Sequence, residues 1–515
     1  MRMLVYAAAG LCASLFLVPP ASAGTGAFTS SDGLLNQIYT ASVNTAEDMV
    51  SDPVNLWPGG CSVPPSGKII LDGVVRDRCV YTADMSVTGQ TLLLAGDDPT
   101  VFRNMILMFA GFQKDDGVIP PSACLCSDPA IDYTGYWLID LYDYVLATGD
   151  LDTLHRVWPN VLRALDRWYP STVDPDNGLV ANIYGARSDY ALLDRHSAFI
   201  DYYNAEYVYV LDLAATMARW IDAQSDSARW ALAARAFSAK VLSNFWDPAA
   251  GAFKDSVSGP LVHGQDDNAF SVLAGIGSSA QGVSAMNYLD AHNHYGYGNS
   301  MADVDVWGDP VWGDLANMRV YSFMSYYELL ARFGLNLDAS ALDLIRREWS
   351  YMVKIGPGTM WEDIGQYGSR PTDRNAPSYD HGWSSGAAPV LTEYVLGVQP
   401  TSPGFATFTV TPHVGDLSFA RGAVPTPHGL ITVSWKIVNG RPVIAVTAPA
   451  GTTWTNPPPA SSKSSGVVKR AGRSCRRSPK ERTRRLEPRS AGDSLPVTAG
   501  RPSPGRTSRM GCRRS

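Results

Sequence analysis

Between about Ser30 and Leu396, apolar residues recur every three or four positions along successive segments. This is the period of a helix that buries one face. Segments rich in Gly, Pro and Asp, such as 174–178 and 247–251, separate these stripes, and Asp150 stands where it can cap a helix. The clearest stripes are Leu138, Leu141, Tyr142 and Val145; Leu154, Val157, Val161 and Leu165; Phe323, Tyr326, Tyr327 and Leu330; and Leu342, Ile345, Trp349 and Met352. The pattern predicts helix after helix with almost no strand.

A region of this length has room for roughly a dozen helices of ordinary length. Each of these helices must bury one face, and hairpins of helices can do so by closing into a ring. The connecting loops at one end of such a ring form a cleft. We therefore expect an all-α toroid of helical hairpins over residues 24–397.

The pattern changes after Gly397. Three runs, 405–411, 429–437 and 442–447, alternate apolar and polar residues and are rich in β-branched side chains. Runs of period two that are separated by Gly and Pro indicate antiparallel strands. We expect a small C-terminal β domain over residues 398–456.

The two ends of the chain differ from the rest. Residues 1–23 begin with Met1-Arg2, continue as an apolar run and end in Ala21-Ser22-Ala23, which are the three parts of a secretory signal peptide. The run is short for a membrane span, and no other stretch is a candidate. We therefore expect a secreted, extracellular protein with no membrane partner. Residues 457–515 are rich in Pro, Ser and Arg, with few large apolar side chains, and predict a disordered basic tail.

Charge and cysteines narrow the range of partners. The net charge is −7, although residues from Ser461 onward contain sixteen Lys and Arg against three acidic residues, so the rest of the chain is strongly acidic. An acidic body argues against nucleic acid as a partner. Cys61, Cys79, Cys124 and Cys126 permit three disulfide pairings, among which the sequence does not choose. A metal site at Cys124-Leu-Cys126 lacks a matching Cys/His pair, so we expect no metal.

The stretch 71–85 concentrates charge between two apolar runs. Burying so many charges is costly unless they pair. The stretch is therefore either an ion-pair network on the surface or a site with acid/base chemistry. Its charged residues are Asp72, Arg76, Asp77, Arg78 and Asp84.

Together with two downstream motifs, this stretch resembles the six-hairpin α-L-rhamnosidases of glycoside hydrolase family 78, in an Arg-Asp-Arg subgroup. The motifs are Asp72-x-x-x-Arg76-Asp77-Arg78-x-x-Tyr81-x-x-Asp84, Thr359-Met-Trp-Glu362 and His381-Gly-Trp-Ser-Ser. The resemblance runs from about Ser30 to Trp454, and residues 397–405 are similar to the passage into that family's C-terminal β domain. It implies an (α/α)6 catalytic ring without a cofactor. It also implies an inverting exo-hydrolase that releases terminal α-L-rhamnose from plant polysaccharides or glycosides.

The resemblance also implies roles for individual residues. Inverting hydrolysis uses one carboxylic acid to protonate the departing oxygen and one carboxylate to activate water, about 6.5–9.5 Å apart. By position, Asp77 matches the general acid and Glu362 the general base. The positions expected to contact the sugar are Asp72, Arg76, Tyr81, Asp84, Trp361 and His381, with Tyr81 in a place usually given to Trp.

Two further positions are candidates because an aromatic residue stands beside a loop. Trp137 starts a predicted helix and could stack on a sugar, and Asp189 beside Tyr190 could bind hydroxyls; either could instead belong to the core. The acidic clusters Asp266-Asp267 and Asp303-x-Asp305 fit solvated loops better than calcium sites.

Some alternatives remain open at this stage. Asp77 is one methylene shorter than the Glu that many relatives carry, and general acid catalysis works over about 2.6–3.2 Å. The chain could therefore be a carbohydrate-binding relative without activity, or a hydrolase for another sugar, such as a uronyl residue bound by Arg76 or Arg187. Glu362 could simply begin a helix, and His381 could be a buried ring with one hydrogen bond. Few residues stand before the first predicted helix, so we expect either that the β-sandwich domains that usually precede the ring in this family are missing or that the sequence is incomplete.

Overall fold

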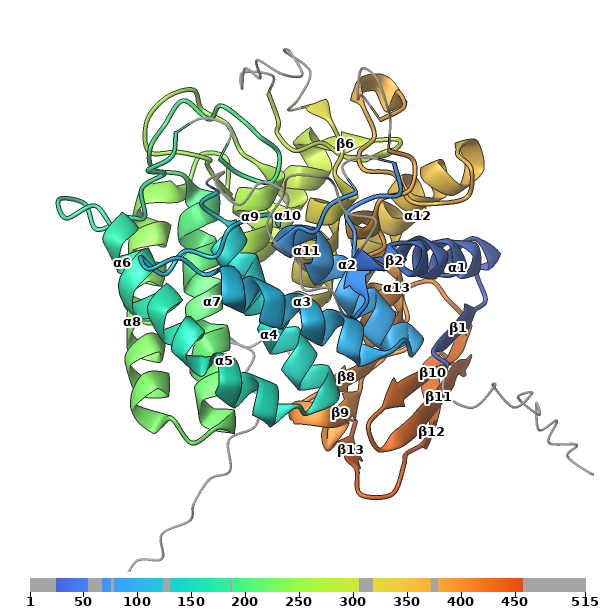
Figure 1. Cartoon of the computed structure of the whole chain (residues 1–515). Coiled ribbons are helices and arrows are strands. Elements are labelled where there is room, and N and C mark those ends of the chain that lie inside the picture. The colour runs from blue at the N-terminus through green and yellow to red at the C-terminus, as the bar shows by residue number, and fades with distance from the viewer. Residues whose placement is uncertain are drawn as a thin grey trace, which may run out of the picture. The chain divides into compact units, whose positions relative to one another are not determined.

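Helices make up most of the chain from residue 33 to residue 395 (Figure 1). The structure, a computed structural model, describes residues 25–53, 67–75, 78–123, 130–185, 188–304, 318–371 and 378–456. All of these residues belong to the first of two units, 1–468 and 469–515. The α-helices are α1 (Gly33–Asp48), α2 (Thr82–Ala95), α3 (Pro99–Phe112), α4 (Tyr133–Thr148), α5 (Leu151–Arg163), α6 (Tyr169–Thr172), α7 (Asp201–Trp220), α8 (Gln224–Phe245), α9 (Gln265–Leu273), α10 (Ser279–His292), α11 (Ser322–Gly334), α12 (Asp338–Ile355) and α13 (Ala387–Val390).

Short helical turns complete the helical part. Two π-helical segments, η2 (Ala164–Trp168) and η6 (Leu391–Val395), extend α5 and α13. Three 3₁₀ turns, η4 (Gln366–Gly368), η5 (Gly382–Ser384) and η7 (Pro403–Phe405), lie in loops. The apolar stripes that the sequence shows fall on α4, α5, α11 and α12, so these four predictions are confirmed.

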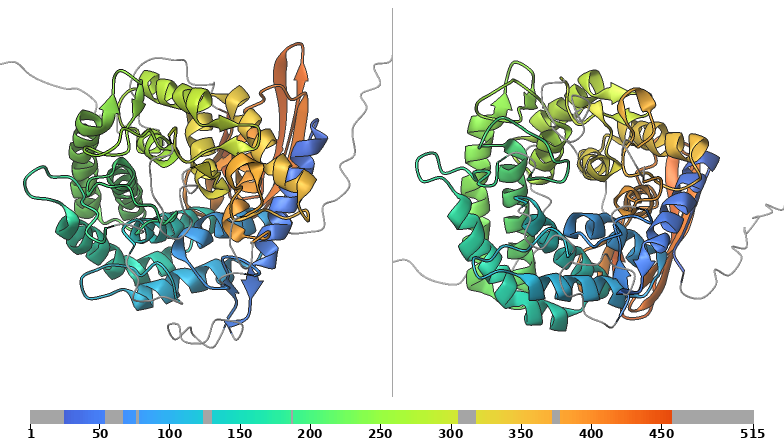
Figure 2. Two further views of the ribbon diagram at one scale, coloured as in Figure 1. Left: turned by 90° about the horizontal axis from the view of Figure 1, so that it is seen from above. Right: turned by 45° about the horizontal axis from the view of Figure 1, so that its top comes forward.

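One set of helices forms a closed series of contacts. Helix α2 contacts α4, which contacts α7; α7 contacts α9, which contacts α11; and α11 contacts η5 and α13, which both contact α2. We call α2, α4, α7, α9, α11 and α13 the inner helices, because most of their residues are buried. A second set, α1, α3, α5, α8, α10 and α12, packs against the inner helices (Figure 2). A helix buried on most sides reads as apolar or small all round, as α2 does from Val87 to Ala95.

Two small sheets contain the strands that follow the helical part and one strand, β1, that precedes it. The first has the order β1-β10-β11-β12, antiparallel throughout, and the second has the order β13-β9-β8. Trp435 of the first sheet donates its indole N–H to the carbonyl of Val395 at 2.9 Å, which ties this sheet to the end of the helical part. The strands are β1 (Ala27–Ser30), β8 (Val398–Pro400), β9 (Thr407–Val410), β10 (Phe419–Thr426), β11 (Gly429–Val438), β12 (Arg441–Thr447) and β13 (Thr453–Thr455).

The sequence pattern missed part of this β structure. It predicted the strands β9, β11 and β12, but not β10 or the N-terminal strand β1, which pairs with β10 in the register Ala27↔Ala423. Three two-stranded ladders also interrupt the helical part. They are β2 (Val50–Ser51) with β3 (Ile69–Ile70), β4 (Trp246–Asp247) with β5 (Ala252–Phe253), and β6 (His294–Tyr295) with β7 (Gly298–Asn299).

Three other observations complete the fold. None of the described helices is both long and apolar enough to cross a membrane. Cys79 is disulfide-bonded. The other cysteines, the expected signal peptide and the expected tail lie outside the described residues.

Candidate active site

The loops before the inner helices are joined to one another by backbone hydrogen bonds. Val320 and Ile364 exchange two bonds of 2.9 Å, and Gly73 forms a bridge with His381. The N–H of Gln265, at the start of α9, donates to the carbonyl of Met301 at 2.7 Å, and Met301 in turn donates to Arg319. The N-terminal ends of α2 and α11 therefore lie close to η5, and the start of α9 is linked to the loop before α11. Helix N-termini carry partial positive charge, which favours carboxylates at this end.

Asp84 and His381 form the first contact between the predicted motifs. Asp84 lies in the first turn of α2, and its Oδ1 is 2.9 Å from Nε2 of His381. Nδ1 of His381 is 3.2 Å from the hydroxyl of Ser378. Both side chains of the pair are buried, so the imidazole has a fixed orientation between a carboxylate and a hydroxyl.

Glu362 joins the same group through its backbone. Its N–H donates to the carbonyl of Ser378 at 3.0 Å, and its carbonyl accepts the indole N–H of Trp383 at 2.8 Å. Ser384 donates its hydroxyl to the carbonyl of Trp361. The side chain of Glu362 is half-buried, in contrast to its buried neighbours Trp361 and Asp363. The structure therefore brings the second and third motifs together, and Glu362 is more exposed than the residues on either side of it.

Asp72 holds the ends of the charged stretch. Its Oδ1 accepts the N–H of Cys79 at 2.9 Å, its N–H donates to the carbonyl of Cys79 at 2.8 Å, and its carbonyl accepts the N–H of Gly382 at 2.7 Å. A Cβ on Gly382 would come within 2.4 Å of the Thr88 hydroxyl, so α2 and η5 approach closely at a glycine. Arg76 and Asp77 lie outside the described residues, and so does Arg187.

Aromatic rings surround this group. Trp383 stacks on Phe323 with ring centroids 5.2 Å apart, lies edge-on to Tyr321 at 5.9 Å, and lies 4.8 Å from His381. Near Asp84, the rings of Tyr81 and Tyr133 are 6.3 Å apart. Ring faces beside carboxylates suit a sugar, which has apolar faces and hydroxyls at its edge. Tyr133, Tyr321 and Phe323 lie outside the three sequence motifs and were not predicted as site residues, whereas Trp383 stands inside the third motif.

Burial keeps these phenols neutral. It raises the pKa of Tyr133, and the nearby carboxylates of Asp84 and Asp132 raise that pKa further. Burial also raises the pKa of Tyr321, against an opposite effect of Arg319. Both hydroxyls are therefore hydrogen-bond donors over the whole ordinary pH range.

Two residues that were predicted to contact a sugar are instead buried and bonded to other parts of the protein. Trp137 is fully buried, and its indole N–H donates to the carbonyl of Ile106 in α3 at 3.1 Å, so the ring packs toward the outer helices. Both oxygens of Asp189 are occupied, and its side chain is 0% exposed. Its donors are the N–H groups of Ala191 and Leu193, the guanidinium of Arg195 and the hydroxyl of Tyr203. Neither residue offers a free face or oxygen to a sugar. Trp361 is also buried, and its ring lies edge-on to that of Tyr379 with the ring centroids 5.2 Å apart.

Arg195 organises a buried acidic cluster below the inner helix ends. Its guanidinium binds Asp189 at 2.8 Å, Asp255 at 2.7 Å and Asp266 at 2.5 Å. Burial raises the pKa of Asp255 to about 7, and it raises the pKa of Asp267 well above its usual range. The expectation that Asp266 and Asp267 lie in a solvated loop is therefore wrong, because both are buried at the start of α9. Among the described residues, no group of three or more His, Cys, Asp or Glu side chains is placed to hold a metal ion.

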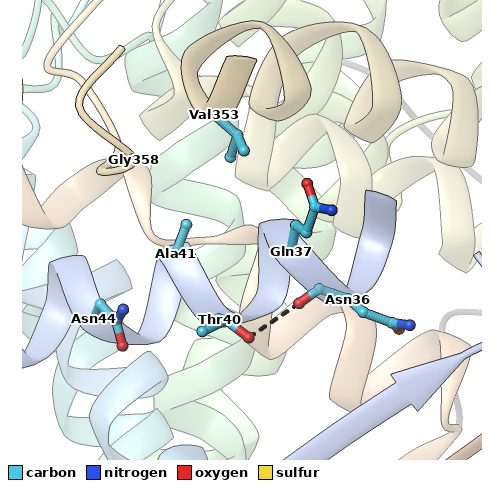
Figure 3. A pocket seen from close by; sticks show the side chains of 7 residues that line it. All are labelled: Asn36, Gln37, Thr40, Ala41, Asn44, Val353 and Gly358. Carbon is cyan, nitrogen blue, oxygen red and sulfur yellow. Dashed lines mark hydrogen bonds between the residues drawn. The ribbon is translucent and has the colours of Figure 1, made fainter. Parts of the chain in front are cut away.

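A hollow on the surface lies apart from these motifs (Figure 3). It is formed by α1, the C-terminal end of α12 and the loop after α12, and it contains none of the candidate site residues. Its lining residues are Asn36, Gln37, Thr40, Ala41, Asn44, Val353 and Gly358.

Comparison with known protein families gives two matches. Residues 66–293 match the bacterial α-L-rhamnosidase six-hairpin glycosidase domain, and residues 397–473 match the bacterial α-L-rhamnosidase C-terminal domain. Together the matches cover more than half of the chain. The chain belongs to the bacterial α-L-rhamnosidase family. The first match contains Asp72, Tyr81 and Asp84, whereas Glu362 and His381 lie in the interval between the two matches.

Individual relatives support the same family. An α-L-rhamnosidase of Alteromonas sp. (strain LOR) is 33% identical over 117 residues, which are 22% of this chain and 12% of that protein. The crystal structure of a GH78 family rhamnosidase of Bacillus sp. GL1 aligns with a TM-score of 0.67 at 20% identity, over 85% of this chain and 43% of that one. An α-L-rhamnosidase of Streptomyces avermitilis, complexed with L-rhamnose, aligns with a TM-score of 0.62 at 16% identity, over 84% of this chain and 38% of that one. The structural likenesses show the fold, and this rhamnosidase-family chain spans less than half of the length of these relatives.

Proposed function

We propose that this chain is a secreted, inverting exo-glycoside hydrolase that releases terminal α-L-rhamnose from plant polysaccharides or glycosides. The observation that carries the proposal is the meeting of Asp84, Glu362 and His381. These residues come from segments almost three hundred positions apart, and Ser378 connects the last two. Membership of the rhamnosidase family supports rhamnose as the sugar.

The architecture proposed for this enzyme is an (α/α)6 toroid over residues 24–397, followed by a β domain over residues 398–456. The closed series of contacts among the inner helices supports the toroid. The start of β8 at Val398 supports the boundary. The signal peptide over residues 1–23 and the tail over residues 457–515 belong to the same proposal.

The half-buried carboxylate of Glu362 acts as general base in this proposal, and Asp77 acts as general acid. Glu362 removes a proton from water as the oxygen attacks the anomeric carbon, and Asp77 gives a proton to the departing glycosidic oxygen. The role of Asp77 rests on the charged motif, since the residue lies outside the described part of the chain. In this proposal Asp72, Asp84 and His381 hold the sugar together with Arg76 and Tyr81, whereas the buried Trp361 is not among these contacts.

The aromatic surroundings agree with a deoxy sugar. Rhamnose carries a methyl group where most hexoses carry a hydroxymethyl group. Rings such as Trp383 and Tyr321 stabilise an apolar methyl better than a hydroxyl, because a hydroxyl buried against a ring loses its hydrogen bonds to water.

The test uses the purified chain, an aryl α-L-rhamnoside and NMR of the first sugar released. We expect the anomer opposite to that of the substrate. Glu362→Gln and Asp77→Asn should each lower kcat at least about a hundredfold while the protein stays folded, because each removes one half of a coupled proton transfer. The matched control is Glu47→Gln on the exposed face of α1, which should leave kcat unchanged.

Three results would contradict parts of the proposal. A retained anomer would exclude the inverting mechanism. Full activity of Glu362→Gln would exclude the assignment of the base. Hydrolysis of an aryl uronide, but not of the rhamnoside, in the same assay would show that the substrate carries a uronyl residue and not rhamnose.

A further inference from the structure

His263 lies between three elements that contact its side chain. It stands just before α9, and its side chain is 4% exposed. Nδ1 of the ring lies 2.9 Å from Oδ2 of Asp303 in the loop after β7, and Nε2 lies 3.2 Å from Oδ2 of Asp247 in β4. The hydroxyl of Tyr288 in α10 lies 2.8 Å from the same oxygen of Asp303 and 3.1 Å from Nδ1. One imidazole therefore contacts two carboxylates and a phenol. Asp303 was expected in a solvated loop, but its side chain is only 8% exposed.

The two carboxylates determine which form of the ring can bind both of them. A neutral imidazole carries one N–H, and its other nitrogen is an acceptor. In either neutral tautomer, one ring nitrogen of His263 would direct a lone pair at a carboxylate oxygen. When both nitrogens are protonated, Nδ1 donates to Asp303, Nε2 donates to Asp247, and the hydroxyl of Tyr288 donates to Asp303 as well. All of these contacts are therefore favourable only in the imidazolium form.

The charges around the ring favour the same form. Burial lowers the pKa of His263, but the hydrogen bonds and charges of Asp303 and Asp247 outweigh this effect and raise the pKa above its ordinary value of 6.5. Burial also opposes ionisation of the two carboxyl groups, yet the hydrogen bonds that they accept hold both of their pKa values below the usual range. The cluster therefore contains one cation and two anions at mildly acidic pH.

Other titratable groups lie around this cluster. The exposed His292 stacks on the ring of Tyr288 with ring centroids 4.1 Å apart. The buried acidic cluster around Arg195, which includes Asp266 and Asp267, makes its own bonds to that guanidinium and to the backbone of α7. The carboxylates bonded to the imidazole are therefore the two from β4 and from the loop after β7.

The loop after β7 connects this cluster to the candidate active site. Two residues before Asp303, the carbonyl of Met301 accepts the N–H of Gln265 at 2.7 Å. The N–H of Met301 donates to the carbonyl of Arg319 at 3.0 Å, in the segment that pairs with the one carrying Glu362. The side-chain bonds of the imidazole therefore hold a loop whose backbone is bonded to the candidate active site.

We propose that His263 is a pH-sensitive clamp, which joins Asp247 and Asp303 as an imidazolium and weakens this connection when the ring loses a proton. The inference goes beyond the proposed function, because it holds whichever sugar the chain binds. Because the folded-state pKa of His263 is raised, the stabilisation is fully present below about pH 6.5 and is lost as the pH rises through the folded-state value. The loop after β7 is therefore held most firmly at mildly acidic pH.

Titration of the ring tests the clamp directly. The chain has eight histidines, whose rings are labelled with ¹³C, and the signal of His263 is the one that His263→Gln removes. We expect its midpoint to lie above pH 6.5 in the wild type and to be about one pH unit lower in Asp247→Asn, because one of the two anions that favour the cation is gone. The matched control is His294→Asn, which removes an exposed histidine 3.7 Å from another carboxylate and should leave the midpoint unchanged.

Thermal melts measure what the clamp contributes to stability. The melting temperature of the wild type should exceed that of His263→Gln most near pH 6, and the difference should shrink as the pH rises through the midpoint of the ring. Subtracting the variant removes the contributions of other groups that titrate in the same range. Hydrogen exchange at the amide of Met301, corrected for the intrinsic effect of pH, should lose protection over the same range in the wild type.

The titration does not depend on whether His263→Gln folds. Nuclear Overhauser contacts between the ring of His263 and that of Tyr288, whose centroids are 4.7 Å apart, also identify the signal. A wild-type midpoint at or below pH 6.5, or the same midpoint in Asp247→Asn, would overturn the inference. So would a melting difference between wild type and His263→Gln that is equal at every pH, or full protection of Met301 above the midpoint. The hydrolysis assay enters none of these measurements, so an inactive wild type would contradict only the proposed function.

Discussion

Glu348 is a carboxyl group that folding removes from water. It lies on α12, it is fully buried, and neither of its oxygens has a hydrogen-bond partner among the described residues. Burial raises its pKa to about 8, against a smaller opposite effect of the hydroxyls of Ser322 and Ser325. In the unfolded chain the same group titrates near 4.5. The folded protein therefore holds a proton on Glu348 that the unfolded chain has already lost at neutral pH.

Glu348→Gln should remove this pH dependence. A raised folded-state pKa means that stability is fully present below about pH 4.5 and is lost as the pH rises toward 8. Each pKa unit corresponds to roughly 1.4 kcal/mol, so the variant should gain up to a few kcal/mol over the wild type between about pH 5 and pH 8.5. Urea unfolding at the two pH values measures the difference, with the exposed Asp115→Asn as control. A wild-type-to-variant difference that does not change with pH would show that Glu348 is ionised in the folded state.

At the scale of single residues, the sequence predicted which motifs lie near one another better than it predicted the partners of individual side chains. The order of the motifs predicted that Asp84, Glu362 and His381 share a site, and the structure brings them together. Their roles toward a sugar stay predictions. The pattern did not predict that Trp137 and Asp189 are structural, because a residue type at a loop edge does not reveal which neighbours fill its hydrogen bonds. Only the tertiary arrangement supplies Ile106 and Arg195 as partners.

At the scale of elements, Asp150 joins two helices. Its Oδ1 accepts the N–H of Thr153 at 2.9 Å and caps α5, as the sequence predicted. Its Oδ2 accepts the hydroxyls of Tyr144 at 2.7 Å and Thr153 at 2.6 Å. Asp150→Ala should cost about 1–2 kcal/mol of unfolding free energy, because it removes the cap and the partner of a largely buried tyrosine. Urea unfolding measures this loss. Asp152→Ala, an exposed acidic residue in the same first turn, should cost only a few tenths of a kcal/mol, and equal losses in both variants would exclude a specific cap.

The elements that the sequence missed share a physical cause. Strand β10 contains Gly422 and Pro425, which weaken a strand signal, yet it is stabilised by partners on both sides. Strand β1 has only four residues and pairs with a segment almost four hundred positions away. The spacing of apolar residues within a short stretch of sequence identifies a helix such as α12. It does not identify a strand that is stabilised mainly by pairing with a segment far away in the sequence.

At the scale of the whole unit, carboxylates gather at the N-terminal ends of inner helices and in the loops before them, and Arg195 compensates three of them. The sequence could not predict this ion-pair cluster. An acidic pair such as Asp266-Asp267 is expected to be exposed to solvent unless the cation that pairs with it is known. That cation lies seventy-one residues from Asp266. Its other partners, Asp189 and Asp255, come from the loops before α7 and α9. One arginine therefore links several of the loops that connect the helices and helps to fix their relative positions.

Arg195→Met tests how much of this order depends on the cation. The variant leaves three buried carboxylates without their partner, and breaking a buried ion pair costs about 3–5 kcal/mol. Without Arg195 these groups can stay buried only when protonated, so their folded-state pKa values must rise above the unfolded ones. The stability of the variant should then fall steeply as the pH rises from about 4 to 8, and its melting temperature should recover partly toward the wild-type value near pH 5. Thermal melts across this range measure the effect, and Arg235→Met on the exposed face of α8 provides the control. A loss that is equal at every pH would mean that Arg195 acts through packing alone, because only an uncompensated carboxylate makes the cost depend on protons.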